Sequence, residues 1–203
     1  MKRHSDLLTI ISPIIIIVFN ICSSFVFKYE VIEWSFIPIT MIEWMMIIFF
    51  ISMNGGTDLV TLWLKRPSKN WLLSIVSLLI VLLYPNIFSN IKNFCGSWML
   101  VTSYILIAVL NPFFEEFYWR GLLTDITPHW NATASTLYSN LLFTFNYVVL
   151  QASFRQSTTW EMILFIFITS IIWCITYQKT NSLRWVILSH FVWNLFTIGS
   201  FVI

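Results

Sequence analysis

The sequence predicts an all-α membrane protein, a polytopic bundle of about seven transmembrane helices forming a single membrane-embedded domain over residues 1–203. Composition is the first indication, because 58% of the residues are hydrophobic and only 10% are charged, against about 45–50% and about 25% in soluble domains. The second is a series of apolar runs close to the roughly 20 residues that a membrane-spanning helix needs. The third is that these runs do not alternate like the strands of a membrane barrel.

Seven apolar runs give the expected helices, since backbone groups in lipid must form hydrogen bonds within their own segment. In chain order the runs are Leu7–Phe27, Phe36–Met53, Trp71–Phe88, Trp98–Leu123, Ala134–Ser153, Trp160–Tyr177 and Leu183–Ile203. The first run follows Met1-Lys2-Arg3-His4 and therefore imitates a signal peptide. Because it is long enough to span and no small-residue cleavage site follows it, we expect a transmembrane helix there.

The distribution of basic residues predicts a multi-pass protein of the cell membrane with a cytoplasmic N-terminus. In that orientation the cytoplasmic segments hold Lys2, Arg3, Lys65, Arg66, Lys69, Arg120, Lys179 and Arg184, and the outer segments hold only Lys28, Lys92 and Arg155. The net charge of +2 is too small to indicate a nucleic-acid partner. The cysteines (Cys22, Cys95, Cys174) are far apart without a CxxC pattern, which argues against a metal–thiolate site.

The fourth apolar run contains the unusual sequence Glu115-Glu116-Phe117-Tyr118-Trp119-Arg120. Ionisable residues at membrane depth are costly and usually mark function. Glu116 and Arg120 are spaced i and i+4, so they share a helix face and can form an ion pair. Glu115 points about 100° away, is free of that arginine and is suited to act as a general base. The alternative is a structural ion pair that only stabilises the bundle.

The seventh run contains His190 and Asn194, again at i and i+4 on one helix face. Both can donate hydrogen bonds to a developing oxyanion, although such residues also serve as interhelical contacts. At a rise of 1.5 Å per residue, Glu115 and His190 lie roughly 12 and 10 Å from the predicted cytoplasmic ends of their helices. The similar depth predicts one shared site, in a cytoplasm-facing cavity built by the runs Trp98–Leu123, Ala134–Ser153 and Leu183–Ile203.

These two motifs carry a resemblance to a known family. EEFYWR matches the EExxxR motif of the CPBP family, the CAAX proteases and bacteriocin-processing (ABI) enzymes, and HFVWN matches its later HxxxN motif. The resemblance covers a core of residues 98–203. It implies an intramembrane endopeptidase that cleaves a membrane-associated peptide or protein, with Glu115 and a histidine activating water and with His190 and Asn194 stabilising the oxyanion. It also raises zinc as a cofactor; we expect metal-free chemistry, with no cofactor.

One position departs from the family pattern. The family has an FxxxH motif between the other two, and here Phe143 is followed by Tyr147 at the histidine position. Tyrosine donates a hydrogen bond but is a poor proton acceptor near neutral pH, and the neighbouring Asn146 cannot take a proton either. Either Glu115 works with Tyr147 in a modified site, or the protein is a catalytically impaired relative that acts as a bacteriocin immunity or scaffold protein by binding a peptide.

Three further features remain open. Glu43 lies within the second run and is a weak candidate for lining the cavity or pairing with a basic group. Pro112, just before the glutamates, can kink its helix and open space beside Glu115. Intramembrane carboxylates also serve transporters and channels, but the two halves of the chain show no internal repeat of the kind common in transporters.

Overall fold

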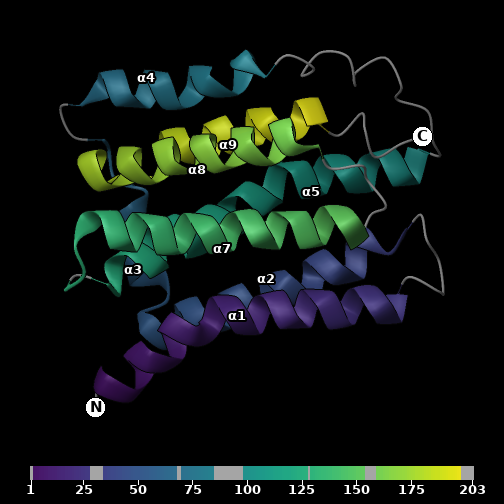
Figure 1. Ribbon diagram of the computed structural model, residues 1–203, viewed down its shortest axis with the longest axis horizontal. Helices are drawn as coiled ribbons and strands as arrows, with labels where there is room; N and C mark the ends of the chain where they lie inside the picture. Colours follow the sequence, from purple (N-terminus) through teal and green to yellow (C-terminus); the bar gives the residue numbers. More distant parts are fainter. Residues whose placement is uncertain are drawn as a thin grey trace.

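The computed structural model describes residues 2–27, 34–67, 70–84, 98–127, 129–153 and 159–197, without the side chains of residues 2–6, 100 and 153. Every regular element in these ranges is a helix, so the all-α prediction is confirmed. The long helices lie side by side with their axes roughly along one direction (Figure 1). The first helix forms one edge of this stack, and the helix that begins at Trp71 forms the opposite edge.

The helices follow the predicted apolar runs closely. In chain order they are α1 (Lys2–Phe27), α2 (Phe36–Asn54), α3 (Thr57–Trp63), α4 (Trp71–Leu79) with η2 (Ile80–Leu83), α5 (Trp98–Glu116) with η4 (Phe117–Leu122) and α6 (Leu123–Asp125), α7 (Ala132–Ser153), α8 (Trp160–Thr180) and α9 (Arg184–Thr197). Each of the seven predicted runs contains a helix. The ends predicted at Phe88 and Ile203 fall outside the described residues.

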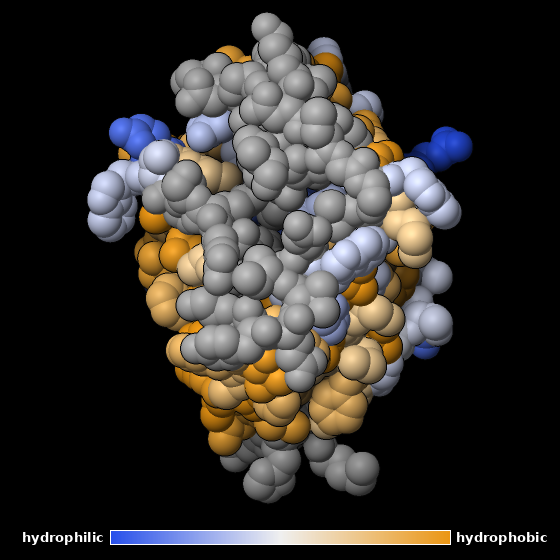
Figure 2. Space-filling model, turned by 90° about the vertical axis from the view of Figure 1, so that its right-hand side faces the viewer, coloured by the Kyte–Doolittle hydropathy of each residue, from blue (hydrophilic) through white to orange (hydrophobic). Residues whose placement is uncertain are grey.

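The bundle has the surface of a protein embedded in lipid. Three helical segments are long and apolar enough to cross a membrane: Leu7–Phe27, Phe36–Asn54 and Trp160–Thr180. Large apolar side chains such as Phe25, Leu72 and Leu83 lie more than 60% exposed on the helices, where water would make them unfavourable and lipid does not. Hydrophobic residues cover broad areas of the flanks in the end view (Figure 2). The protein is therefore a membrane protein.

The connection between α2 and α4, which none of the seven predicted runs covers, contains the short helix α3. Gly55 and Gly56 adopt positive φ values of 140° and 56° at the end of α2, which a side chain would disfavour. They turn the chain into α3, whose last residue, Trp63, is buried. The backbone oxygen of Trp63 accepts a hydrogen bond of 2.8 Å from the amide of Leu183. This connection is thus packed against the bundle.

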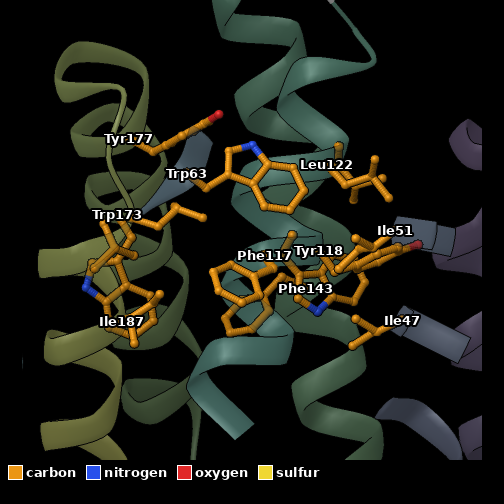
Figure 3. Close-up of a cluster of buried hydrophobic side chains, with 14 of the residues drawn as sticks. Ile47, Ile51, Trp63, Phe117, Tyr118, Leu122, Phe143, Trp173, Tyr177 and Ile187 are labelled. Atoms are coloured by element: carbon orange, nitrogen blue, oxygen red, sulfur yellow. The ribbon is translucent and has the colours of Figure 1, made fainter. Parts of the chain in front are cut away.

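The hydrophobic core is centred on η4, where the α-helix of α5 widens into a π-helical stretch. All six residues of η4 are buried. Aromatic and aliphatic side chains from α2, α3, α7, α8 and α9 surround them, with Trp63 near Phe117 and with Trp173 and Ile187 beyond (Figure 3). Such π-helical stretches are uncommon and occur frequently at functional sites. Here the stretch begins directly after Glu116.

Candidate active site

His190 of α9 lies between the two adjacent glutamates of α5. Its Nδ1 atom is 2.6 Å from Oε1 of Glu116, and its Nε2 atom is 3.4 Å from Oε2 of Glu115. All three side chains are at most 5% exposed. Packing of α5 against α9 therefore brings together the two polar motifs that lie 74 residues apart in sequence.

Arg120 fixes the second glutamate from the other side. Its Nη1 atom donates to the same Oε1 atom of Glu116 at 3.0 Å, the i and i+4 pair that the spacing predicts. Its Nη2 atom donates to Ser170 of α8 at 3.0 Å, and Ser170 in turn donates to the side-chain oxygen of Asn140. The guanidinium also lies 3.9 Å from the ring centre of Phe143, a cation–π contact. Arg120 is fully buried, and its charge is compensated by these contacts.

Aromatic side chains hold the imidazole ring of His190 in its plane. The indole of Trp173 stacks on it with ring centres 4.9 Å apart, and the ring of Phe143 approaches edge-on at 6.2 Å. Trp173 is itself held by a hydrogen bond of 2.9 Å from its Nε1 to Ser189. Because Glu116 carries the ion pair with Arg120, the near Nδ1 of His190 is the nitrogen that donates to it. The Nε2 atom is then the one directed at Glu115.

A cavity adjoins this cluster. The predicted site residues Glu115, Tyr147, His190 and Asn194 all line it. Its other lining residues come from α2, α5, α7 and α9: Phe36, Thr40, Glu43, Tyr104, Ile107, Ala108, Asn111, Leu150, Gln151 and Thr197. The predicted residues therefore fall into two groups, since Glu116 and Arg120 are not in the lining and lie behind the imidazole.

The position of this cavity differs from the sequence-based expectation. It extends from His190 toward the end of the bundle where α2 begins at Phe36 and α9 reaches Thr197, which is opposite the N-terminal end (Figure 1). Toward the N-terminal end the site is closed by the packed core, including Trp63, Leu122 and Leu183. With the N-terminus in the cytoplasm, the cavity does not face the cytoplasm. Helix α2 also contributes to its wall, through Phe36, Thr40 and the weak candidate Glu43.

Glu43 is the residue whose importance the sequence left undecided. It is fully buried, lines the cavity and accepts a 2.8 Å hydrogen bond from Asn146 through Oε1. Asn146 accepts a 2.9 Å hydrogen bond from Asn20 of α1. The signal in the sequence was a lone carboxylate in an apolar run. Only the packing of α2 against α5 places it near the motif residues.

The arrangement of donor atoms does not match a zinc site. Zinc in proteins takes three or four nitrogen, sulfur or oxygen ligands at about 2.0–2.3 Å. In the part of the chain that the structure describes, no group of three or more His, Cys, Asp and Glu side chains is arranged to hold a metal ion. Both ring nitrogens of His190 already face carboxylate oxygens. These residues therefore do not fit a zinc ion.

These observations define a polytopic membrane protein with a buried cluster of carboxylates, histidine and arginine beside an internal cavity. The family described as type II CAAX prenyl endopeptidase Rce1-like matches residues 96–196, about half of the chain. That match includes both the glutamate motif and the His190 motif. The chain belongs to this family of CAAX-type intramembrane proteases within the CPBP group. No curated protein and no solved structure matches the chain.

Proposed function

We propose that this protein is an intramembrane endopeptidase that cleaves a membrane-associated peptide with water activated by Glu115 and His190. The observation that supports this most strongly is the 3.4 Å approach of His190 Nε2 to Glu115 at the wall of the cavity. A water molecule hydrogen-bonded to both groups would be oriented for attack and could lose its proton to the carboxylate. Glu116, held by Arg120, positions the imidazole as a carboxylate does in a catalytic triad.

Two other cavity residues supply hydrogen bonds to the substrate in this proposal. Asn194 lies one helical turn after His190, and Tyr147 faces the same cavity from α7. Both carry donors that suit the carbonyl oxygen of a scissile peptide bond as negative charge develops on it. Tyr147 thus takes the role of a donor rather than that of the proton acceptor expected at this position of the family motif.

We also propose that the N-terminus is cytoplasmic and that substrate enters from the outer side. The basic residues of the connections at Lys65-Arg66 and Lys179–Arg184 favour a cytoplasmic location for that end of the bundle. The cavity extends toward the other end. A substrate whose scissile bond lies in the outer part of the membrane therefore fits this geometry better than a cytoplasmic C-terminal peptide.

Cleavage by the purified protein in liposomes tests the endopeptidase proposal. The probes are a peptide anchored by one transmembrane segment, with its scissile bond in the outer part of the membrane, and a farnesylated peptide with a C-terminal CAAX sequence. We expect Glu115→Gln to lower kcat/KM by at least about 10²-fold, the usual contribution of a general base. The matched control is Glu161→Gln, because Glu161 is exposed at the start of α8 and is not among the residues that line the cavity. Equal cleavage by wild type and Glu115→Gln would exclude Glu115 as the base.

A second candidate function is supported by Tyr147. Because no histidine occupies this wall of the cavity, the protein could bind a peptide such as a bacteriocin without cleaving it. Expression in a bacteriocin-sensitive strain distinguishes the two functions. Protection that persists in Glu115→Gln, together with an absence of cleavage by wild type, supports binding. Protection that disappears in this variant supports catalysis.

A further inference from the structure

Glu43 of α2 is held in the cavity wall by a chain of hydrogen bonds that runs through α7 to α1. Its Oε1 atom accepts the 2.8 Å hydrogen bond from Asn146 of α7, whose side chain is oriented by Asn20 of α1. The other carboxyl oxygen, Oε2, is buried and has no hydrogen-bond partner within the described residues. A buried polar atom without a partner costs free energy unless it serves a purpose. Because Glu43 lines the cavity, a group that binds there can supply the missing partner.

Trp44, the residue after Glu43, connects this part of α2 to α5, the helix that carries Glu115. Trp44 donates a 2.8 Å hydrogen bond from Nε1 to the side-chain oxygen of Asn111, one turn before Glu115. Its indole also stacks on Phe114 with ring centres 4.7 Å apart. Glu43 and Glu115 line the same cavity, one from α2 and the other from α5. The two carboxyl groups face a common space from different helices.

The balance of charges assigns different states to the carboxyl groups. Within the described cluster, Glu116 is paired with Arg120, and Glu115 is next to His190. Glu43 contacts neutral amides and no described cation. A carboxylate buried in a membrane without a counter-ion is strongly unfavourable, and two neighbouring carboxyl groups tend to share one proton. The proton therefore belongs on Glu43, whose Oε2 can carry it.

We propose that Glu43 is a second catalytic carboxyl group, the acid that protonates the substrate carbonyl oxygen while Glu115 takes the proton of water. This inference rests on the proposed endopeptidase function. Water oxygen bonds to the carbonyl carbon, one water proton passes to Glu115, and the Glu43 proton passes to the carbonyl oxygen to give a neutral gem-diol. Glu115 then protonates the leaving nitrogen as the C–N bond breaks, and a gem-diol hydroxyl returns its proton to Glu43.

The pH dependence of cleavage distinguishes an acid from a structural residue. Wild type requires Glu115 ionised and Glu43 protonated, so its kcat/KM should fall at both low and high pH. Glu43→Gln keeps the hydrogen bond with Asn146 and cannot donate a proton. We expect it to reduce kcat/KM by about 10²-fold and to lose the high-pH decline that ionisation of Glu43 causes. Glu43→Asp, which retains an acid, should keep that decline at a reduced rate.

The outcomes separate this inference from the proposed function. If Glu115→Gln is inactive but Glu43→Gln is as active as wild type, the proposed role of Glu43 is overturned. The endopeptidase proposal then remains intact. An unchanged high-pH decline in a slower Glu43→Gln also overturns it, because a structural defect would scale the whole profile. No cleavage by wild type overturns the endopeptidase, and the role of Glu43 with it. If Glu43→Gln does not fold, the Glu43→Asp profile decides: a retained decline supports the acid, and its absence overturns it.

Discussion

The Nδ1 atom of His190 lies 2.6 Å from Oε1 of Glu116, and Arg120 donates to the same oxygen at 3.0 Å. One carboxylate oxygen of Glu116 thus contacts both the guanidinium of Arg120, one turn further along the same segment, and the imidazole of His190 on α9. Burial of Arg120 and orientation of His190 therefore depend on the same atom. This explains why two adjacent glutamates have different surroundings, one inside the polar cluster and one at the cavity wall.

Replacing Glu116 is expected to destabilise the protein as well as to reduce cleavage. Glu116→Leu leaves the guanidinium of Arg120 buried without its counter-ion, and breaking such a pair costs about 3–5 kcal/mol. The double variant with Glu116→Leu and Arg120→Met removes both charges and should recover most of that stability. Its activity should remain low, because His190 still lacks its carboxylate. Thermal unfolding in detergent, measured with the cleavage assay, gives both quantities.

The single and double variants also give a contradicting outcome. If Glu116→Leu unfolds at the wild-type temperature, the ion pair does not stabilise the fold. If the double variant regains full cleavage, the contact between Glu116 and His190 does not matter for the reaction.

The sequence predicted the helices and the local pairs because both depend on short-range periodicity. Glu116 with Arg120 follows from the helical repeat, and the similar depth of Glu115 and His190 follows from the rise per residue. The contact of His190 with Glu116 could not be predicted, since it depends on how α9 is rotated against α5. The position of Glu43 depends on α2 packing between helices distant in sequence, and α3 is too short to give a clear periodic signal.

Tyr147 provides a direct test of the modified cavity wall. Tyr147→Phe removes a hydrogen-bond donor while retaining the ring, and loss of one oxyanion donor typically lowers kcat by about 10²–10³-fold. Tyr147→His supplies a proton acceptor and should raise kcat/KM above that of wild type at neutral pH. Steady-state cleavage of the same peptide measures both. Rates unchanged in both variants would show that this side chain only fills space.

Gly121 should tolerate no larger residue while Trp63 is present. A Cβ atom at this position would lie 2.7 Å from Cε2 of the Trp63 indole, well inside van der Waals contact. We expect Gly121→Ala to lower stability by about 1–3 kcal/mol, the usual cost of overpacking. In a Trp63→Leu background the same substitution should cost much less. A double-mutant cycle, measured by thermal unfolding, gives the difference in stability cost between the two backgrounds. An equal cost in both would show that the strain does not arise from contact with Trp63.

Asp125, beyond the membrane-spanning part of its segment, predicts a dependence of stability on pH. Its carboxyl oxygens accept hydrogen bonds of 2.8 Å from Trp63 and from Tyr177. Partial burial raises the pKa of Asp125 above its ordinary 3.8, although these hydrogen bonds oppose the shift. A raised pKa in the folded state stabilises the fold below the unfolded pKa, and this contribution disappears as pH rises through the folded pKa.

The wild-type Tm should accordingly fall as pH rises through the acidic range, relative to Asp125→Asn, which does not titrate. Asparagine can keep both contacts, with its oxygen toward Trp63 and its amide group toward Tyr177. Tm measured across this range for the two proteins gives the difference. A difference that stays constant with pH, or that grows in the opposite direction, would contradict the assigned shift.

The side of the membrane from which substrate enters is tested by labelling single cysteines in intact cells. In a background where Cys22, Cys95 and Cys174 are serine, a cysteine replaces either Asp58 or Glu161. Asp58 is exposed on α3 at the N-terminal end of the bundle, and Glu161 is exposed at the start of α8 at the cavity end (Figure 1). Because the basic connections favour a cytoplasmic N-terminal end, a membrane-impermeant maleimide should label Glu161→Cys in intact cells. It should label Asp58→Cys only after permeabilisation.

The reverse pattern would place the cavity on the cytoplasmic side and make a cytoplasmic peptide the substrate that fits it.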